Sequence, residues 1–240
     1  MDEAEYRALV THDERHWWYR GRRRVINAQL ERLDLRRGGS VLDAGCGSGR
    51  TMDDLARWGS VAGFDLNELG VEHARARGHE DVRLARVEEI PWPDDSFDLI
   101  TCLDVLEHTP DDVGSLRELL RVARPGATLL ATVPAYKLLW SAHDVANHHY
   151  RRYRRGQLVE AGRTAGWEPV TATYFNSILL APAAAVRLVA RRPGRRARSQ
   201  IELTPRALDR VLELPMRAEA AAIRRGVRLP AGLSLMAVFR

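Results

Sequence analysis

Lysine and cysteine are scarce in this chain of 240 residues. Lys137 is the only lysine, so arginine supplies almost all of the positive charge. Such an imbalance also arises from codon bias, and the net charge of +5 is therefore weak evidence for a polyanionic partner. Because the chain also lacks a recognisable RNA-binding module, we expect no nucleic-acid partner.

The two cysteines, Cys46 and Cys102, are too few for a disulfide framework, and neither has a metal-ligand neighbour at a recognised spacing. The sequence thus predicts reduced thiols and no metal site. Long apolar runs are absent as well, since no stretch reaches the roughly 20 residues that span a bilayer. The N-terminus is charged from Asp2 onward, so we expect neither a signal peptide nor a transmembrane segment, and a cytoplasmic location.

Hydrophobic residues make up 45% of the chain, which is enough for one large core with an appended segment. We expect an N-terminal helical lid at residues 1–37 and a main domain at 38–240 that includes a helical insertion at 177–226. The sequence does not indicate an oligomeric state.

The most informative stretch is Val41-Leu42-Asp43-Ala44-Gly45-Cys46-Gly47-Ser48-Gly49, an apolar strand that runs into three alternating glycines. Glycine permits positive φ and lets the backbone approach a ligand closely, so this loop is suited to a small molecule. Its G-x-G-x-G spacing differs from the G-x-x-G ending of the dinucleotide fingerprint. Asp43 would also repel a phosphate, whereas it would tolerate a cationic or zwitterionic ligand.

Apolar strands and amphipathic helices alternate along the rest of the chain, which predicts an α/β fold with a doubly wound, mostly parallel sheet. We expect strands at residues 40–44, 61–66, 82–86, 127–133, 169–175 and 233–239, and a fourth strand in chain order that ends near Cys102. The second strand ends in Asp65, where a carboxylate at the sheet edge can accept both hydroxyls of a ribose. Asp65 could instead cap the helix that follows, although Asn67 would serve equally well.

Together these elements resemble the class I S-adenosylmethionine (SAM) dependent methyltransferases. VLDAGCGSG is similar to their motif I, and the loop and strand at 87–100 and the Arg124-Pro125-Gly126 turn are typical of the small-molecule branch related to the quinone methylases. The resemblance covers residues 38–135 and implies a seven-stranded Rossmann-like sheet. It also implies that SAM is bound by Asp43, Ala44, Gly45, Cys46, Gly47, Gly49, Asp65, Leu66, Val87, Glu88, Leu103, Asp104 and His108.

One position departs from this family pattern. An acid usually faces the adenine amino group where this chain has Arg86. We therefore expect the adenine contact to pass to the backbone of Val87 or to Glu88.

The loop after the fifth strand borders the active site in this fold and carries the candidate proton acceptors. His143, His148 and His149 are candidates for an oxygen nucleophile, because an unperturbed imidazole accepts a proton near neutral pH. Tyr150 or Glu107 could serve if the accepting atom is carbon. A solvated charge run on a surface coil is the alternative interpretation of this loop.

Aromatic and arginine side chains are the candidate acceptor-binding groups. Adjacent helical residues point about 100° apart, so one member of the Trp17-Trp18 pair is expected to face a ligand or lid. The full set is Trp17, Trp18, Arg20, Arg22, Tyr136, Trp140, Arg151 and Arg152. They favour an anionic small molecule, with an isoprenoid diphosphate as the best match. The alternatives are O-methylation of a neutral natural-product or quinone-like acceptor, RNA methylation, and a non-enzymatic SAM-binding role.

The segment at 178–198 combines an apolar helix with an arginine-rich tail. It is too short to span a bilayer. We expect a lid over an apolar acceptor or a peripheral membrane contact, with a kink at Pro182.

Overall fold

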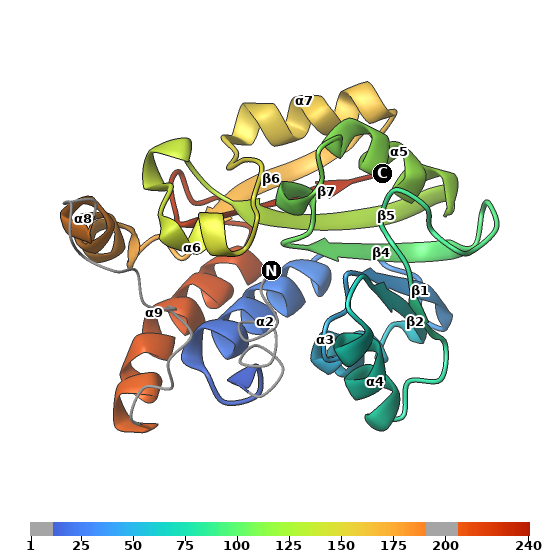
Figure 1. Cartoon of the computed structure of the whole chain (residues 1–240), viewed down its shortest axis with the longest axis horizontal. Coiled ribbons are helices and arrows are strands. Elements are labelled where there is room, and N and C mark those ends of the chain that lie inside the picture. Colours follow the sequence, from blue (N-terminus) through green and yellow to red (C-terminus); the bar gives the residue numbers. More distant parts are fainter. Residues whose placement is uncertain (1–11, 191–205) are drawn as a thin grey trace.

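The computed structural model describes residues 12–190 and 206–240, which form one seven-stranded sheet in the order β3-β2-β1-β4-β5-β7-β6 (Figure 1). Strands β1 to β5 are parallel, and β7 pairs antiparallel with both β5 and β6. This confirms the predicted fold. The strands are β1 (Gly39–Ala44), β2 (Gly59–Asp65), β3 (Val82–Leu84), β4 (Phe97–Leu103), β5 (Ala123–Pro134), β6 (Pro169–Phe175) and β7 (Ser234–Phe239).

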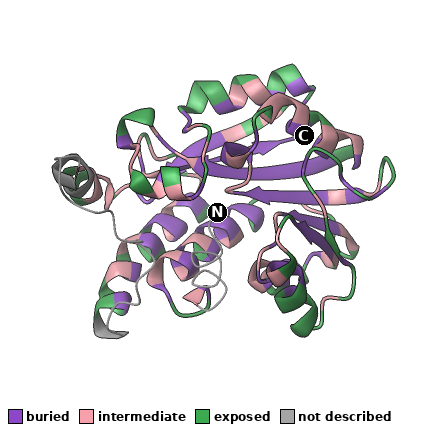
Figure 2. Cartoon of the chain, in the orientation of Figure 1, coloured by how far each residue is buried: buried purple, intermediate pink, exposed green. Residues whose placement is uncertain are grey.

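Helices cover both faces of the sheet, and the strands between them are largely buried (Figures 1 and 2). On one face α5 and α7 enclose a core around Phe64, Leu116 and Phe239. On the other face α2 and α9 pack against each other and enclose Ile26 and Met216. The α-helices are α2 (Trp17–Leu30), α3 (Arg50–Leu55), α4 (Glu68–Ala76), α5 (Asp112–Arg121), α6 (Ala142–Ala146), α7 (Arg155–Ala165), α8 (Leu180–Ala190) and α9 (Arg206–Arg224).

The close approach of α2 and α9 depends on Gly21. A Cβ at this position would lie 2.8 Å from both Cβ and Cγ of Met216, nearer than side-chain atoms normally come. The first turns of α2 are thereby held against α9. We predicted that residues 1–37 form a lid. In the described part of this segment, helix α2 contributes side chains to the core. Residues 1–11 lie outside the described part of the chain.

Two local expectations need correction. Arg124-Pro125-Gly126 does not precede the fifth strand but lies inside β5, where the pairing register with β4 shifts between Phe97 and Leu99. Pro182 does not interrupt a helix, because it lies in the first turn of α8. Backbone N–H groups in the first turn have no intrahelical acceptor, so proline loses no hydrogen bond there.

Within residues 12–190 and 206–240, every helix is too short or too polar to cross a membrane. Residues 191–198 of the predicted lid or membrane-contact segment lie outside the described part of the chain.

Candidate active site

A cavity of about 1080 Å³ opens at the carboxyl ends of β1, β2 and β4, under the first turn of α2. This is where a doubly wound sheet binds its ligands, at the point where the strand order reverses. The volume exceeds what one drug-sized ligand needs, so the cavity has room for two small molecules side by side.

The glycine loop forms the floor of the cavity. Gly45, Gly47 and Gly49 all have positive φ, at 75°, 54° and 79°. A Cβ on Gly45 would lie 2.4 Å from Cγ2 of Val105, so only glycine fits there. The loop is tied to β2, since the N–H of Gly47 donates to Asp65 Oδ2 at 2.8 Å.

Asp65 stands beside the loop as predicted. Its Oδ1 accepts a hydrogen bond from the backbone N–H of Asn67 at 2.9 Å. Asn67, and not Asp65, caps α4, because its side chain accepts from the N–H of Leu69 at 3.0 Å. Next to Asp65, the apolar side chain of Leu66 is 64% exposed at the cavity wall. An exposed leucine beside an acid is suited to a ligand with a flat ring and a ribose.

Asp43 lies deep in the cavity and is almost fully buried. Burial raises its pKa to about 6, although the hydroxyl of Thr101, which donates to Oδ1 at 2.6 Å, and the charge of Arg22 oppose this shift. Arg22 from α2 is ion-paired with Asp104, which follows β4 and has a positive φ of 58°. Two acids therefore surround this end of the cavity, a setting for a cationic group.

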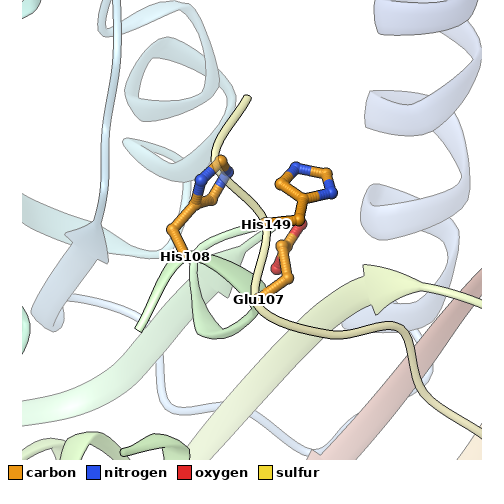
Figure 3. A group of neighbouring side chains, drawn as sticks. All are labelled: Glu107, His108 and His149. Carbon is orange, nitrogen blue, oxygen red and sulfur yellow. The ribbon is translucent and has the colours of Figure 1, made fainter. Parts of the chain in front are cut away.

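A second group of polar side chains lines the cavity (Figure 3). Glu107 and His108 come from the short 3₁₀ helix η1 (Leu106–His108), and His149 comes from the loop after α6. The rings of His108 and His149 meet edge to face with centroids 4.5 Å apart. Burial and the neighbouring His149 lower the pKa of His108 to about 3, and burial together with Asp104 raises the pKa of Glu107 well above its usual range.

His149 is held in place by Asp144. The Nδ1 atom of His149 lies 2.9 Å from Asp144 Oδ1, and the same carboxylate accepts from Arg152 at 2.6 and 3.0 Å. Burial alone would raise the pKa of Asp144, but the hydrogen bonds from His149 and Arg152 lower it. Asp144 therefore stays ionised and fixes the orientation of the His149 ring, which lines the cavity.

The arginines predicted to bind the acceptor are engaged elsewhere. Arg20 is ion-paired with the buried Glu213, and Arg151 binds Asp112 at 2.6 Å and the carbonyl of Thr109 at 3.1 Å. Arg22 and Arg152 do line the cavity, but both are paired with acids. Both Trp17 and Trp18 line it, where one was expected. The side chains around the cavity do not include Ala44, Gly49, Arg20, Tyr136, Trp140 or Arg151.

The comparisons with known proteins fit this geometry. Residues 42–131 match the methyltransferase domain family. The chain is 35% identical over 161 residues to a protein of Mycolicibacterium smegmatis named a probable S-adenosylmethionine-dependent methyltransferase, covering 65% of this chain and 61% of that one. It is 35% identical over 128 residues to a ubiquinone biosynthesis O-methyltransferase of Hahella chejuensis, covering 47% of this chain and 54% of that one.

In sequence this chain is therefore similar to the class I methyltransferases. Its fold is also that of the geranyl diphosphate C-methyltransferase from Streptomyces coelicolor A3(2), with a TM-score of 0.59, 14% identity, and coverage of 88% of this chain and 76% of that one. The chain spans 54% to 62% of the length of the first curated relatives it matches.

The cavity suits SAM, on three observations. Gly45 and Gly47 bring the backbone to the cavity surface, the Asp65 carboxylate lines the cavity as ribose hydroxyls would require, and the buried acid Asp43 lines it as a cationic ammonium would require. The residues that the family resemblance assigns to SAM and that also line the cavity are Leu66, Val87, Glu88, Leu103, Asp104 and His108. When bound, SAM supplies a methyl group already activated by its sulfonium.

Several residues that line or support the cavity were not predicted from the sequence. Asp144 was missed because Ser141 and Asp144 have the S-x-x-D spacing of a helix cap, and the structure shows that the N–H of Ser141 does donate to this carboxylate at 2.8 Å. Asn176, Leu179 and Leu212 reach the cavity from segments with no motif. The positive φ of Asn176, 57°, is visible only in the structure.

Proposed function

We propose that this chain transfers the methyl group of SAM to a hydroxyl oxygen of a small molecule with an apolar body. The observation that carries the proposal is the orientation of His149 by the ionised Asp144, in a wall of histidines that faces the predicted cofactor site. In the reaction the hydroxyl oxygen bonds to the methyl carbon, the sulfur–carbon bond breaks, and the hydroxyl proton leaves. The products are a methyl ether and S-adenosylhomocysteine.

A histidine-rich wall suits a hydroxyl acceptor because a proton must be removed as the oxygen attacks. Imidazole titrates near neutral pH and is therefore a suitable base. Asp144 fixes the ring of His149 by its Nδ1 atom, as a carboxylate does for a general-base histidine. Positioning the oxygen in line with the sulfonium methyl supplies most of the remaining catalysis.

The rest of the wall is apolar. Trp17, Trp18, Leu179, Pro182, Ala183 and Leu212 line the cavity beyond the predicted cofactor site. These side chains suit a ring system or hydrocarbon chain. The curated relatives include an O-methyltransferase of ubiquinone biosynthesis, which supports the oxygen acceptor.

The anionic acceptor favoured by the sequence is our second candidate. The fold likeness to a geranyl diphosphate C-methyltransferase supports it, but at 14% identity this likeness concerns the fold alone. All four arginines expected to hold a diphosphate are paired with acids, so their positive charge is already neutralised by carboxylates. A hydroxyl acceptor therefore ranks first.

The test is an acceptor panel with purified full-length protein and SAM. One arm holds phenols and catechols with and without an alkyl or isoprenoid tail, and the other holds isopentenyl and geranyl diphosphate. Mass spectrometry detects added methyl groups, and S-adenosylhomocysteine release measures turnover. Methyl ethers from the first arm support the proposal. Methylation confined to the diphosphates, with S-adenosylhomocysteine binding intact, overturns it in favour of the second candidate.

A further inference from the structure

Glu107, His108 and His149 together form a compact group of metal-ligand atoms. One donor atom from each side chain lies within 4.8 Å of the other two (Figure 3). The three residues lie on the cavity wall, so the space between their donor atoms adjoins the predicted acceptor site. Bound to a metal at about 2.0–2.2 Å, tetrahedral ligand atoms are roughly 3.3 Å apart. Small rotations of these side chains would reach that geometry.

A second, independent observation points to a ligand here. Glu107 is 1% exposed, and its Oε2 atom has no hydrogen-bond partner among the described residues. Buried carboxylate oxygens are almost always paired, because an unpaired one loses its hydration without compensation. The orphaned oxygen belongs to the same side chain that supplies the acidic member of the group.

The surroundings of His149 also match those of a metal ligand. A ligating histidine usually donates its other ring N–H to a carboxylate, which fixes the ring and makes the ligating nitrogen more basic. Asp144 occupies that position at 2.9 Å from Nδ1, and Arg152 in turn fixes Asp144. The remaining nitrogen, Nε2, is the atom available to a metal.

We propose that Glu107, His108 and His149 bind a divalent metal ion of the imidazole-binding class, best matched by Zn²⁺. Two imidazoles and one carboxylate form a donor set that suits zinc, cobalt or manganese better than Mg²⁺ or Ca²⁺, which prefer all-oxygen sites. The remaining coordination position faces the cavity. There the ion would bind the acceptor oxygen and lower the pKa of its hydroxyl, as zinc does for water. This catalytic role rests on the proposed function and replaces the base role given there to His149, because a metal-bound Nε2 cannot accept a proton; the hydroxyl proton would pass to His143 or His148, which also line the cavity. Metal binding itself does not depend on the proposed function.

Metal binding is tested directly on untagged full-length protein that has been stripped with a chelator and dialysed. Zn²⁺ is titrated calorimetrically, and Co²⁺ is added separately because its visible absorption reports the ligand set. The variants are Glu107→Gln and His149→Gln, which preserve approximate size, and the control is His73→Ala, which removes an exposed histidine on α4. S-adenosylhomocysteine binding by each variant shows that it is folded.

We expect the wild-type protein and His73→Ala to bind one equivalent of Zn²⁺ equally well. Each of the other two variants should bind at least tenfold more weakly and lose the Co²⁺ absorption. Failure of the wild-type protein to bind Zn²⁺, or equal binding by Glu107→Gln and His149→Gln, would overturn the proposal. If one of these two variants does not fold, the other, together with His108→Gln, decides the question.

Turnover separates this proposal from the proposed function. If stripped and reloaded proteins methylate a hydroxyl acceptor equally fast, the metal role fails and O-methylation stands. If Zn²⁺ binds as expected but no hydroxyl acceptor is methylated, the metal site stands and the proposed function fails.

Discussion

Thr101 in β4 donates a hydrogen bond of 2.6 Å to Asp43 in β1, and both side chains are closed off from solvent. The two strands are neighbours in the sheet, with Asp43 directly opposite Thr101. This bond favours the ionised carboxylate but does not outweigh burial, which raises the pKa of Asp43 to about 6. Asp43 thus titrates close to neutral pH, at the place where a cationic part of the cofactor is predicted.

The first prediction concerns the pH dependence of cofactor binding. A cation beside Asp43 favours the ionised form, so the pKa of Asp43 in the complex should be lower than about 6. Affinity for SAM should then be constant above pH 7 and fall as pH drops below 6, by up to about tenfold per pH unit. Calorimetry from pH 5 to pH 8 measures this. Asp43→Asn should bind weakly at every pH, and a wild-type affinity that is flat across this range would contradict the role given to Asp43.

The second prediction concerns stability without cofactor. Because the folded-state pKa of Asp43 is raised above its unfolded value of 3.8, the folded state holds a proton more tightly, and this group lowers stability as pH rises through about 4 to 6. Asp43→Asn removes that cost and should be more stable than wild type at pH 7, by about 1–3 kcal/mol.

Denaturant unfolding at several pH values measures the difference between the two proteins. The advantage of Asp43→Asn should shrink as pH falls toward 4, where the wild-type carboxyl is protonated. A variant that is less stable at pH 7 would show that the Asp43–Thr101 hydrogen bond outweighs the burial of charge.

The third prediction uses two glycines with nearly the same backbone. Gly45 and Gly38 have φ of 75° and 72°, but a Cβ on Gly45 would strike Val105 whereas one on Gly38 would meet nothing within 4 Å. Gly38→Ala should lower the free energy of unfolding by about 1–2 kcal/mol, which is the cost of placing a side chain at positive φ. Gly45→Ala should lower the free energy of unfolding further, because the added Cβ also meets Val105, and it should abolish S-adenosylhomocysteine binding.

Thermal unfolding and calorimetry check both effects. The double variant Gly45→Ala, Val105→Ala should recover part of the lost stability by removing the contact at 2.4 Å. Equal behaviour of Gly38→Ala and Gly45→Ala would mean that the loop tolerates a side chain where the cofactor is predicted to bind.

Much of the fold could be predicted because its signals are local. The glycine loop needs three neighbouring positions with positive φ, and Asp65 simply ends an apolar strand, so both are visible in short stretches of sequence. The cofactor side of the cavity follows from these stretches, because parallel strands bring their carboxyl ends to one edge.

The partners of the arginines could not be predicted because they depend on distant contacts. Arg20 pairs with Glu213, which is 193 residues away, and no pattern around either residue indicates that pairing. The proposed metal-ligand group could not be predicted for the same reason. Glu107 and His108 are adjacent, but His149 joins them only through the path of the loop after α6, so no ligand spacing occurs in the sequence.

The last prediction separates a structural arginine from a substrate-binding one. Arg151 binds the Asp112 carboxylate and the carbonyls of Thr109 and Pro110, contacts that fasten its loop to the start of α5. Arg151→Ala should therefore lower stability by about 1 kcal/mol or less, because the pair is partly exposed, and leave the KM for the acceptor within about twofold. Thermal unfolding and steady-state kinetics measure the two effects.

Arg163→Ala is the matched control, since Arg163 forms only an exposed ion pair within α7. Arg152→Ala is unsuitable, because it would leave the buried Asp144 without its main partner and destabilise the fold by about 3–5 kcal/mol. If Arg151→Ala raises KM tenfold or more while kcat and stability match Arg163→Ala, then Arg151 contacts the acceptor. That result would restore the anionic acceptor as the first candidate, because a guanidinium released from Asp112 would then be what the acceptor binds.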